Sequence, residues 1–225
     1  MDALTWLQTQ FNEGVAFNGR SPIELPNTNR MTLAHWFYVW GFRRGAEVGV
    51  ERGVYSEALC KANPNLSLYC VDRWMPLRNY RDHVSASKLE GFYQEATQRL
   101  APYRATLIRK LSVEAAKDVP DGSLDFVYID ASHRLEHVIA DLGAWSPKVR
   151  AGGVVAGHDF IKCRLPSLMH VPQAVYAWAD AYEIKSWFVL GRQAKMPGEL
   201  RDDGRSWFWV QREPRSWKAG PKVHQ

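Results

Sequence analysis

No apolar run in this 225-residue sequence approaches the roughly 20 residues that a membrane-spanning helix needs. The first residues, Met1 to Trp6, also lack the basic start and apolar centre of a secretory signal peptide. Cysteine is scarce: Cys60, Cys70 and Cys163 are odd in number and have no metal-type spacing, which argues against a disulfide framework or a cysteine-based zinc site. We therefore expect a cytoplasmic protein with reduced thiols and no membrane contact.

The composition is otherwise that of an ordinary globular protein, with 46% hydrophobic and 24% charged residues. The net charge of +5 comes partly from basic residues near the C-terminus, and a solvated tail explains them more simply than a nucleic-acid site does. We predict a helical extension over residues 1–40, one main domain over residues 41–212, and a basic tail over residues 213–225. The extension would either close over a ligand site or pack against the edge of the main fold.

The stretch from Gly45 to Ser56, with glycines at positions 49 and 53, organises the rest of the sequence. The apolar residues up to Val48 suit a strand, and the spacing after Gly53 suits a helix. A tight turn between them would aim backbone N–H groups and a helix N-terminus into one crevice. Glycines in such a turn let a ligand lie against the main chain, because no Cβ stands in the way.

A second strand follows from Leu66 to Val71 and ends at Asp72. Strand, glycine turn, helix, strand and acid together form a βαβ unit. Asp72 falls 19 positions after Gly53, close to the spacing of about 20 expected for a carboxylate that binds ribose hydroxyls. Trp74, in the loop just after this acid, is placed to stack on a nucleoside or to form a wall beside it.

Further strands and helices alternate along the remaining sequence. We expect helices over residues 2–13, 31–40 and 87–100, and further helices that begin near residues 53, 112, 135 and 171. Thr32 and Ser112 are the expected N-caps, and residues 18–30 should form a loop. Further strands are expected over residues 105–111, 124–129, 154–157, 185–190 and 206–211. This order predicts an α/β fold with a Rossmann-like, seven-stranded, mostly parallel sheet, one antiparallel edge strand, and helices on both faces. Ligands of such sheets bind at the carboxyl ends of the strands, where Asp72, Ser112, Asp130 and His158-Asp159 fall.

Four runs carry a family resemblance: Glu47-Val-Gly-Val-Glu-Arg-Gly53, Tyr69-Cys-Val-Asp72, Asp121-Gly-Ser-Leu-Asp-Phe-Val-Tyr-Ile-Asp-Ala-Ser-His133 and Gly152-Gly-Val-Val-Ala-Gly-His-Asp-Phe160. With these runs at this spacing, residues 40–212 resemble the class I S-adenosylmethionine-dependent methyltransferases. Within that class they look most like methyltransferase domain 24, a family of small-molecule O-methyltransferase-like proteins. The resemblance implies an enzyme that methylates a hydroxyl group of a small molecule by in-line displacement at the sulfonium of its cofactor.

The resemblance also assigns roles along the S-adenosylmethionine molecule. Glu47 and Gly49 would hold the methionine portion, Asp72 the ribose, and Ser112 would lie near adenine. Asp130 would face the methionine amino group or the reacting centre. The full set of implied cofactor residues is Glu47, Gly49, Val50, Gly53, Tyr55, Ser56, Asp72, Arg73, Trp74, Ser112 and Asp130.

Candidate catalytic residues are His133, His158 and Asp159. Histidine side chains in general titrate near neutral pH, so either residue is suited to take a proton from an acceptor hydroxyl. Related O-methyltransferases hold a divalent metal at these strand ends, so Asp130, His158 and Asp159 are also candidate metal ligands. Because magnesium prefers oxygen ligands, the histidine favours a softer metal or none.

Two other classes stay open at this stage. A nucleotide-dependent oxidoreductase would share the βαβ start and the ribose acid, although it normally has a third glycine in the first turn. A non-catalytic binding subunit would keep the fold without the chemistry. Nucleic acid is a less favoured partner, because the fourth strand ends Asp130-Ala-Ser-His133 and lacks the Asn-Pro-Pro-Tyr-like tetrad of base amino-group methylation. The acceptor itself and self-association into a homo-oligomer are left open.

Overall fold

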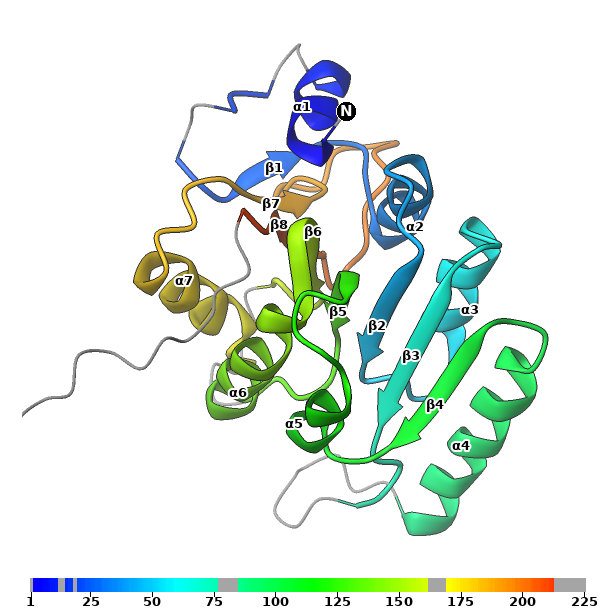
Figure 1. The fold of residues 1–225 in the computed structure, drawn as a ribbon. Helices are drawn as coiled ribbons and strands as arrows, with labels where there is room; N and C mark the ends of the chain where they lie inside the picture. Colours follow the sequence, from blue (N-terminus) through cyan, green and yellow to red (C-terminus); the bar gives the residue numbers. More distant parts are fainter. Residues whose placement is uncertain (1, 12–14, 18–19, 77–84, 162–168, 213–225) are drawn as a thin grey trace, which may run out of the picture.

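The computed structural model describes residues 2–11, 15–17, 20–76, 85–161 and 169–212. The predicted tail over residues 213–225 and Cys163 lie outside these residues. Within the described residues one mixed sheet of eight strands runs through the molecule, in the order β1-β7-β8-β6-β5-β2-β3-β4 (Figure 1). The strands are β1 (Ile23–Leu25), β2 (Arg44–Val48), β3 (Ser67–Asp72), β4 (Ala105–Arg109), β5 (Leu124–Ile129), β6 (Val149–Gly157), β7 (Trp187–Leu190) and β8 (Trp207–Val210).

Helices cover both faces of the sheet. They are α1 (Ala3–Gln10), α2 (Arg30–Val39), α3 (Val54–Ala62), α4 (Ala86–Leu100), α5 (Ser112–Ala115), α6 (Leu135–Trp145) and α7 (Val171–Ala181), with short 3-10 turns η1 (Ala116–Asp118) and η2 (Ser146–Lys148). The buried hydrophobic side chains form two clusters. Helices α1 to α4 contribute to one cluster, and α5 to α7 contribute to the second (Figure 1). No helix in the described ranges combines the length and apolar character needed to cross a bilayer.

The alternation of side chains along β5 shows how the strands build two cores. Phe126 and Tyr128 point into the cluster under α1 to α4, whereas Val127 and Ile129 point into the cluster under α5 to α7. All four are buried, as expected for a central strand covered on both faces. The predicted α/β class, with a mostly parallel sheet and helices on both faces, is therefore confirmed.

The antiparallel strand differs from the prediction in its place. Strand β8 runs antiparallel to β6 on one side and to β7 on the other, so it lies inside the sheet and not at its edge. The eighth strand is β1, which pairs in parallel with β7 in the register Ile23 to Phe188 and Leu25 to Leu190. It lies within residues 18–30, for which the sequence predicts a loop. Its three residues are too few for a strand pattern to emerge between Pro22 and Pro26.

Two predicted helix caps are also corrected. Asn29, not Thr32, is the N-cap of α2, and its side chain accepts from the backbone nitrogens of Met31 and Thr32. The hydroxyl of Thr32 completes a capping box by accepting from the backbone of Asn29. Leu111 is the N-cap of α5, and Ser112 is the first residue of that helix.

The sheet order reverses beside β2. The chain leaves β2 toward β3 on one side, and β5 returns to pair with β2 on the other. The crevice outside the carboxyl ends of strands at such a reversal is the usual ligand site of open α/β sheets. This topology directs attention to the ends of β2, β3 and β5.

Candidate functional site

A cavity of about 870 Å³ opens at the carboxyl ends of β2, β3, β4 and β5. This volume lies in the range of about 300–1,000 Å³ that is typical of small-molecule sites. Its wall combines the glycine turn after β2, the acid at the end of β3, the start of α5, and the loop from β5 to α6. The cavity-lining residues that matter below are Arg30, Glu47, Gly49, Val50, Tyr55, Asp72, Arg73, Leu111, Ser112, Val113, Asp130, His133 and Asp141.

Gly49 brings the ends of β2 and β5 together. Its backbone has φ +97°, and its N–H donates to the carbonyl of Val71 at 2.8 Å. A Cβ at this position would overlap the backbone oxygen of Asp130, so only glycine fits. The cavity floor therefore depends on a close contact between two strand ends.

Asp72 holds the glycine turn in shape. Its Oδ2 accepts from the backbone nitrogens of Val50 at 3.1 Å and Glu51 at 2.9 Å, and its Oδ1 accepts from the nitrogen of Trp74 at 2.9 Å. A carboxylate offers about four lone-pair sites, so acceptor capacity remains at Oδ1. Asp72 lines the cavity and can still bind a hydroxyl there.

Glu47 is a buried acid in the cavity wall, with only 2% of its surface exposed. Burial raises its pKa to about 8, although the hydroxyl of Ser56 donates to its Oε2 and opposes the shift. A buried carboxyl of this kind gains most from a ligand that brings its own positive charge. Glu47 is therefore suited to bind a cationic group.

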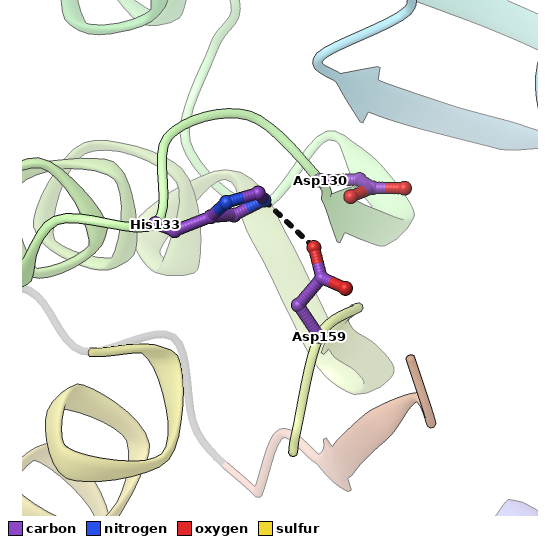
Figure 2. Close-up of side chains that lie close together, drawn as sticks. All are labelled: Asp130, His133 and Asp159. Atoms are coloured by element: carbon purple, nitrogen blue, oxygen red, sulfur yellow. Dashed lines mark ion pairs between the residues drawn. The ribbon is translucent and has the colours of Figure 1, made fainter. Parts of the chain in front are cut away.

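Asp130, His133 and Asp159 come together at the ends of β5 and β6. Each offers a ligand-type atom, and these atoms lie within 4.8 Å of one another. The imidazole of His133 and the carboxylate of Asp159 point toward one another (Figure 2). Their Nε2 and Oδ2 atoms are 2.7 Å apart. This pair and Asp130 offer a base, a hydrogen-bond acceptor and two anions within a small space.

The charges in this cluster depend on one another. Burial tends to raise the pKa of Asp159, but the hydrogen bonds from His133 and His158 outweigh it and hold that pKa well below its usual range. Burial raises the pKa of Asp130, and His158 opposes this shift. Burial lowers the pKa of His158, but the neighbouring Asp159 and Asp130 outweigh it, so the pKa rises overall. The group is therefore an acid–imidazole network and not a set of independent sites.

The family model that matches the chain is a methyltransferase domain (Methyltransf_24), and it matches residues 46–160, just over half of the chain. The match begins in β2, ends after Asp159, and so spans the whole cavity floor.

The chain belongs to the class I S-adenosylmethionine-dependent methyltransferases.

Solved structures of this class share the fold. The methyltransferase aligns with an O-methyltransferase from Bacillus cereus in complex with SAH, at a TM-score of 0.57 and 14% identity over 81% of this chain and 80% of that one. A proposed caffeoyl-CoA O-methyltransferase from Staphylococcus aureus aligns at 0.56 and 16% identity, over 92% and 97% of the two chains. The N-methyltransferase NodS from Bradyrhizobium japonicum aligns at 0.54 and 13%, over 82% and 95%. At these identities the likeness concerns the fold.

A curated relative is also detected, the uncharacterized protein y4gI of Sinorhizobium fredii (strain NBRC 101917 / NGR234). It is 27% identical over 128 residues, which cover 52% of this chain. The same match covers only 13% of that relative's own length. The shared part is thus a single region of a much longer protein.

Most of the predicted cofactor residues face the cavity of the methyltransferase. Those that line it are Glu47, Gly49, Val50, Tyr55, Asp72, Arg73, Ser112 and Asp130. A residue of the core fixes the position of Ser112, because its Oγ accepts a hydrogen bond from the indole N–H of Trp145 at 2.8 Å. Of the predicted catalytic residues, His133 lines the cavity.

Three predicted cofactor residues lie behind the wall. Trp74 is 1% exposed and donates through Nε1 to the carbonyl of Glu51 at 2.7 Å, so it supports the glycine turn from the core and does not form a cavity wall. Ser56 is fully buried behind Glu47. Gly53 faces α4, where a Cβ would meet Ala96 at 3.4 Å. In this structure these three residues support the cavity wall from behind.

The predicted metal set is corrected in one member. His133, rather than His158, completes the group with Asp130 and Asp159. His158 lies beneath the chain at Gly204, where a Cβ would overlap its ring, and its Nε2 is buried without a hydrogen-bond partner in the described structure. Its Nδ1 lies 3.4 Å from Asp159. His158 therefore lies against Asp159, behind the group formed by Asp130, His133 and Asp159.

Two cavity residues do not emerge from the sequence. Arg30, at the start of α2, places its guanidinium 3.9 Å from Asp130 and over the ring of Tyr55. Asp141, on α6, is buried beside Ser112, and this burial raises its pKa to about 6. Neither residue belongs to a motif, and no spacing rule finds them. The signal that the sequence offers for Asp141 is an acid on the apolar face of α6, beside Val138 and Leu142.

Proposed function

We propose that this protein transfers a methyl group from S-adenosylmethionine to a hydroxyl oxygen of a small molecule. The supporting observation is that the cavity joins two kinds of site. Glu47 suits the ammonium group of the cofactor's methionine end, and Asp72 suits its ribose. The His133–Asp159 pair suits removal of a proton from an acceptor hydroxyl. Family membership establishes the class of enzyme, whereas the acceptor atom is part of this proposal.

The residues present fit the cofactor along its length. Asp72 would accept from the ribose hydroxyls, and Glu47 would bind the ammonium of the methionine end. Leu111 and Val113 are 44% and 39% exposed and line the cavity beside Ser112, so they offer apolar surface to adenine. When bound, the cofactor supplies an electrophilic methyl group on a sulfonium.

His133 would take the acceptor proton. Its Nε2 lies 2.7 Å from Oδ2 of Asp159, so that carboxylate orients the imidazole. The imidazole would hold the hydroxyl proton, while the cofactor would give its methyl group to the acceptor oxygen and keep the electron pair of the broken carbon–sulfur bond. The products are a methyl ether, S-adenosylhomocysteine and a protonated His133. Asp159, held anionic by its low pKa, stabilises that imidazolium.

A screen of methyl acceptors tests this proposal. Phenols and hydroxylated sugars should accept a methyl group, and amines of matched shape should accept less. His133→Gln should lower kcat by roughly 10² to 10⁴-fold, the usual contribution of a general base, with little change in affinity for S-adenosylhomocysteine. Exclusive methylation of amines, or full activity in His133→Gln, would show that the proposed acceptor chemistry is wrong.

A divalent metal is the competing use of the same cluster. Two carboxylates and one imidazole within 4.8 Å suit a transition metal such as manganese better than magnesium. It would supply Lewis acidity toward the acceptor oxygen. Equilibrium dialysis with Mn²⁺ on the purified protein and on Asp159→Asn, together with assays in EDTA, distinguishes a metal site from a histidine base. A metal enzyme would lose activity in EDTA, and its binding of Mn²⁺ would depend on Asp159.

A further inference from the structure

We propose that Arg30 binds the carboxylate of the cofactor's methionine end, so that the segment before the matched methyltransferase domain completes the cofactor site. The inference rests on the proposed use of S-adenosylmethionine and adds a residue outside residues 46–160. It identifies the partner of the one anionic group that the cofactor brings to this end of the cavity.

The charge of the cavity requires a cation here. Glu47 and Asp130 line this end, and both suit the ammonium and the sulfonium of the cofactor. Once the ligand ammonium has ionised Glu47, neither acid can bind a carboxylate, because like charges at short range repel strongly in a partly buried site. A cofactor that carries ammonium and carboxylate on one carbon therefore needs a positive group beside these acids.

The guanidinium of Arg30 has the required freedom. Its side chain is 35% exposed, lines the cavity and stacks over the Tyr55 ring, with 5.4 Å between Cζ and the ring centroid. Asp130 is its ion-pair partner at 3.9 Å, which is too long for a hydrogen bond. Among the described residues no acceptor takes a hydrogen bond from its five N–H donors, and a planar fork of this kind binds carboxylates in pairs of hydrogen bonds.

Other cations in the cavity wall face elsewhere. Arg52 lies over the ring of Phe92 and pairs with Glu95, and Lys110 pairs with Asp118. Arg73 donates to the carbonyl of Met75 beside the ribose acid. Within the described part of the chain, Arg30 is therefore the arginine or lysine that contacts the acids of the methionine end.

The backbone of Arg30 is fixed on both sides. Its N–H donates to Asp202 at 2.7 Å, and its carbonyl accepts from the hydroxyl of Tyr55 at 2.9 Å. Tyr55 belongs to α3, which follows the glycine turn, so Arg30 is held in register with the cofactor-binding loop. This fixed backbone leaves the side chain as the part that can respond to a ligand.

Calorimetric titration with two ligands tests the inference. S-adenosylhomocysteine carries the carboxylate, and its decarboxylated analogue, S-adenosyl-3-thiopropylamine, keeps the ammonium and lacks the carboxylate. The wild-type protein should bind the first at least ~10-fold more tightly. Arg30→Met should weaken the binding of S-adenosylhomocysteine roughly 10- to 100-fold, the usual loss for a charge-assisted hydrogen bond. The same variant should bind the analogue with an affinity within about twofold of the wild type. Arg30→Lys should recover part of the loss.

Arg104→Met is the matched control, because Arg104 is exposed and precedes β4 at the opposite end of the sheet. It should bind both ligands like the wild type. Equal affinity of the wild-type protein for both ligands, or an equal loss for both in Arg30→Met, would overturn the assignment of Arg30. A raised KM for an anionic acceptor with unchanged cofactor affinity would overturn it as well. Absence of saturable binding by the wild type would instead refute the proposed function.

Discussion

Oδ2 of Asp72 lies 2.9 Å from the backbone nitrogen of Glu51, so the acid expected to bind the cofactor's ribose also shapes the glycine turn. Asp72→Ala should therefore affect both ligand binding and the fold. We expect loss of detectable affinity for S-adenosylhomocysteine and a destabilisation of about 1–3 kcal/mol, because three backbone N–H groups lose their acceptor. Titration and urea unfolding measure the two effects, and Asp180→Ala, at an exposed site on α7, is the control.

Glu47 should make the stability of the protein fall as pH rises. Its pKa is about 8 in the fold and 4.5 for an unperturbed glutamate, so the folded state binds the proton more tightly between these two values. The stabilising effect of the protonated form is complete below pH 4.5 and is lost as pH rises toward 8. Urea unfolding from about pH 5 to 8 should show this decline, of the order of a few kcal/mol, in the wild type and not in Glu47→Gln.

The same carboxyl should release a proton when the cofactor binds. A ligand ammonium beside Glu47 stabilises the charged form and lowers the pKa from about 8. Near pH 7, calorimetric titration of S-adenosylhomocysteine in buffers of different ionisation enthalpy should therefore report proton release that Glu47→Gln abolishes. Glu114→Gln, at an exposed site on α5, should behave like the wild type; buffer-independent heats in the wild type would contradict the prediction.

Gly49→Ala should be among the most damaging single substitutions. The new Cβ would overlap the backbone of Asp130, and a left-handed φ of +97° adds its own strain. We expect a loss of more than about 2 kcal/mol and of cofactor binding. Gly122→Ala separates the two causes, because Gly122 has φ +66° and a Cβ added there would meet nothing within 4 Å. Equal losses of unfolding free energy in the two variants would show that the backbone around Gly49 shifts and relieves the clash.

Trp74→Phe should weaken cofactor binding without removing a ligand contact. The variant keeps an aromatic ring against Tyr93 but loses the indole donor to the carbonyl of Glu51. We expect a loss of roughly threefold to tenfold in affinity for S-adenosylhomocysteine, since one hydrogen bond of the turn is missing. An unchanged affinity would mean that Asp72 alone fixes the turn.

The sequence predicts this fold well where a strand is buried on both faces. Strand β5 has the predicted bounds, since six residues from Leu124 to Ile129 form a continuous strand pattern before Asp130. Strand β2 ends at Val48, as predicted, and β3 is shifted by one residue from its predicted bounds. Strand β6 begins at Val149, five residues before the predicted start at residue 154. By contrast, β1 depends on its partner β7, more than 160 positions later, and no local pattern reports such a pairing.

The candidate site shows the same division. Residues at strand ends, such as Asp72 and Asp130, follow from topology, because parallel strands end at one edge of the sheet. The direction of a side chain does not follow in the same way. Trp74 turns into the core because its backbone adopts φ +43°, and Arg30 reaches the cavity because Asp202, far along the chain, fixes its position.

The pairing of β1 with β7 has a consequence for trimmed forms of the protein. All four residues of β7, Trp187–Leu190, are buried, and β1 covers one of its hydrogen-bonding edges. A fragment beginning at residue 41 would leave that edge unpaired, and an exposed apolar edge strand is a template for association with other chains. The pairing of Glu24 with Arg205 at 2.7 Å would be lost at the same time. The segment that carries β1 thus protects the sheet against aggregation, independently of any part it plays in catalysis.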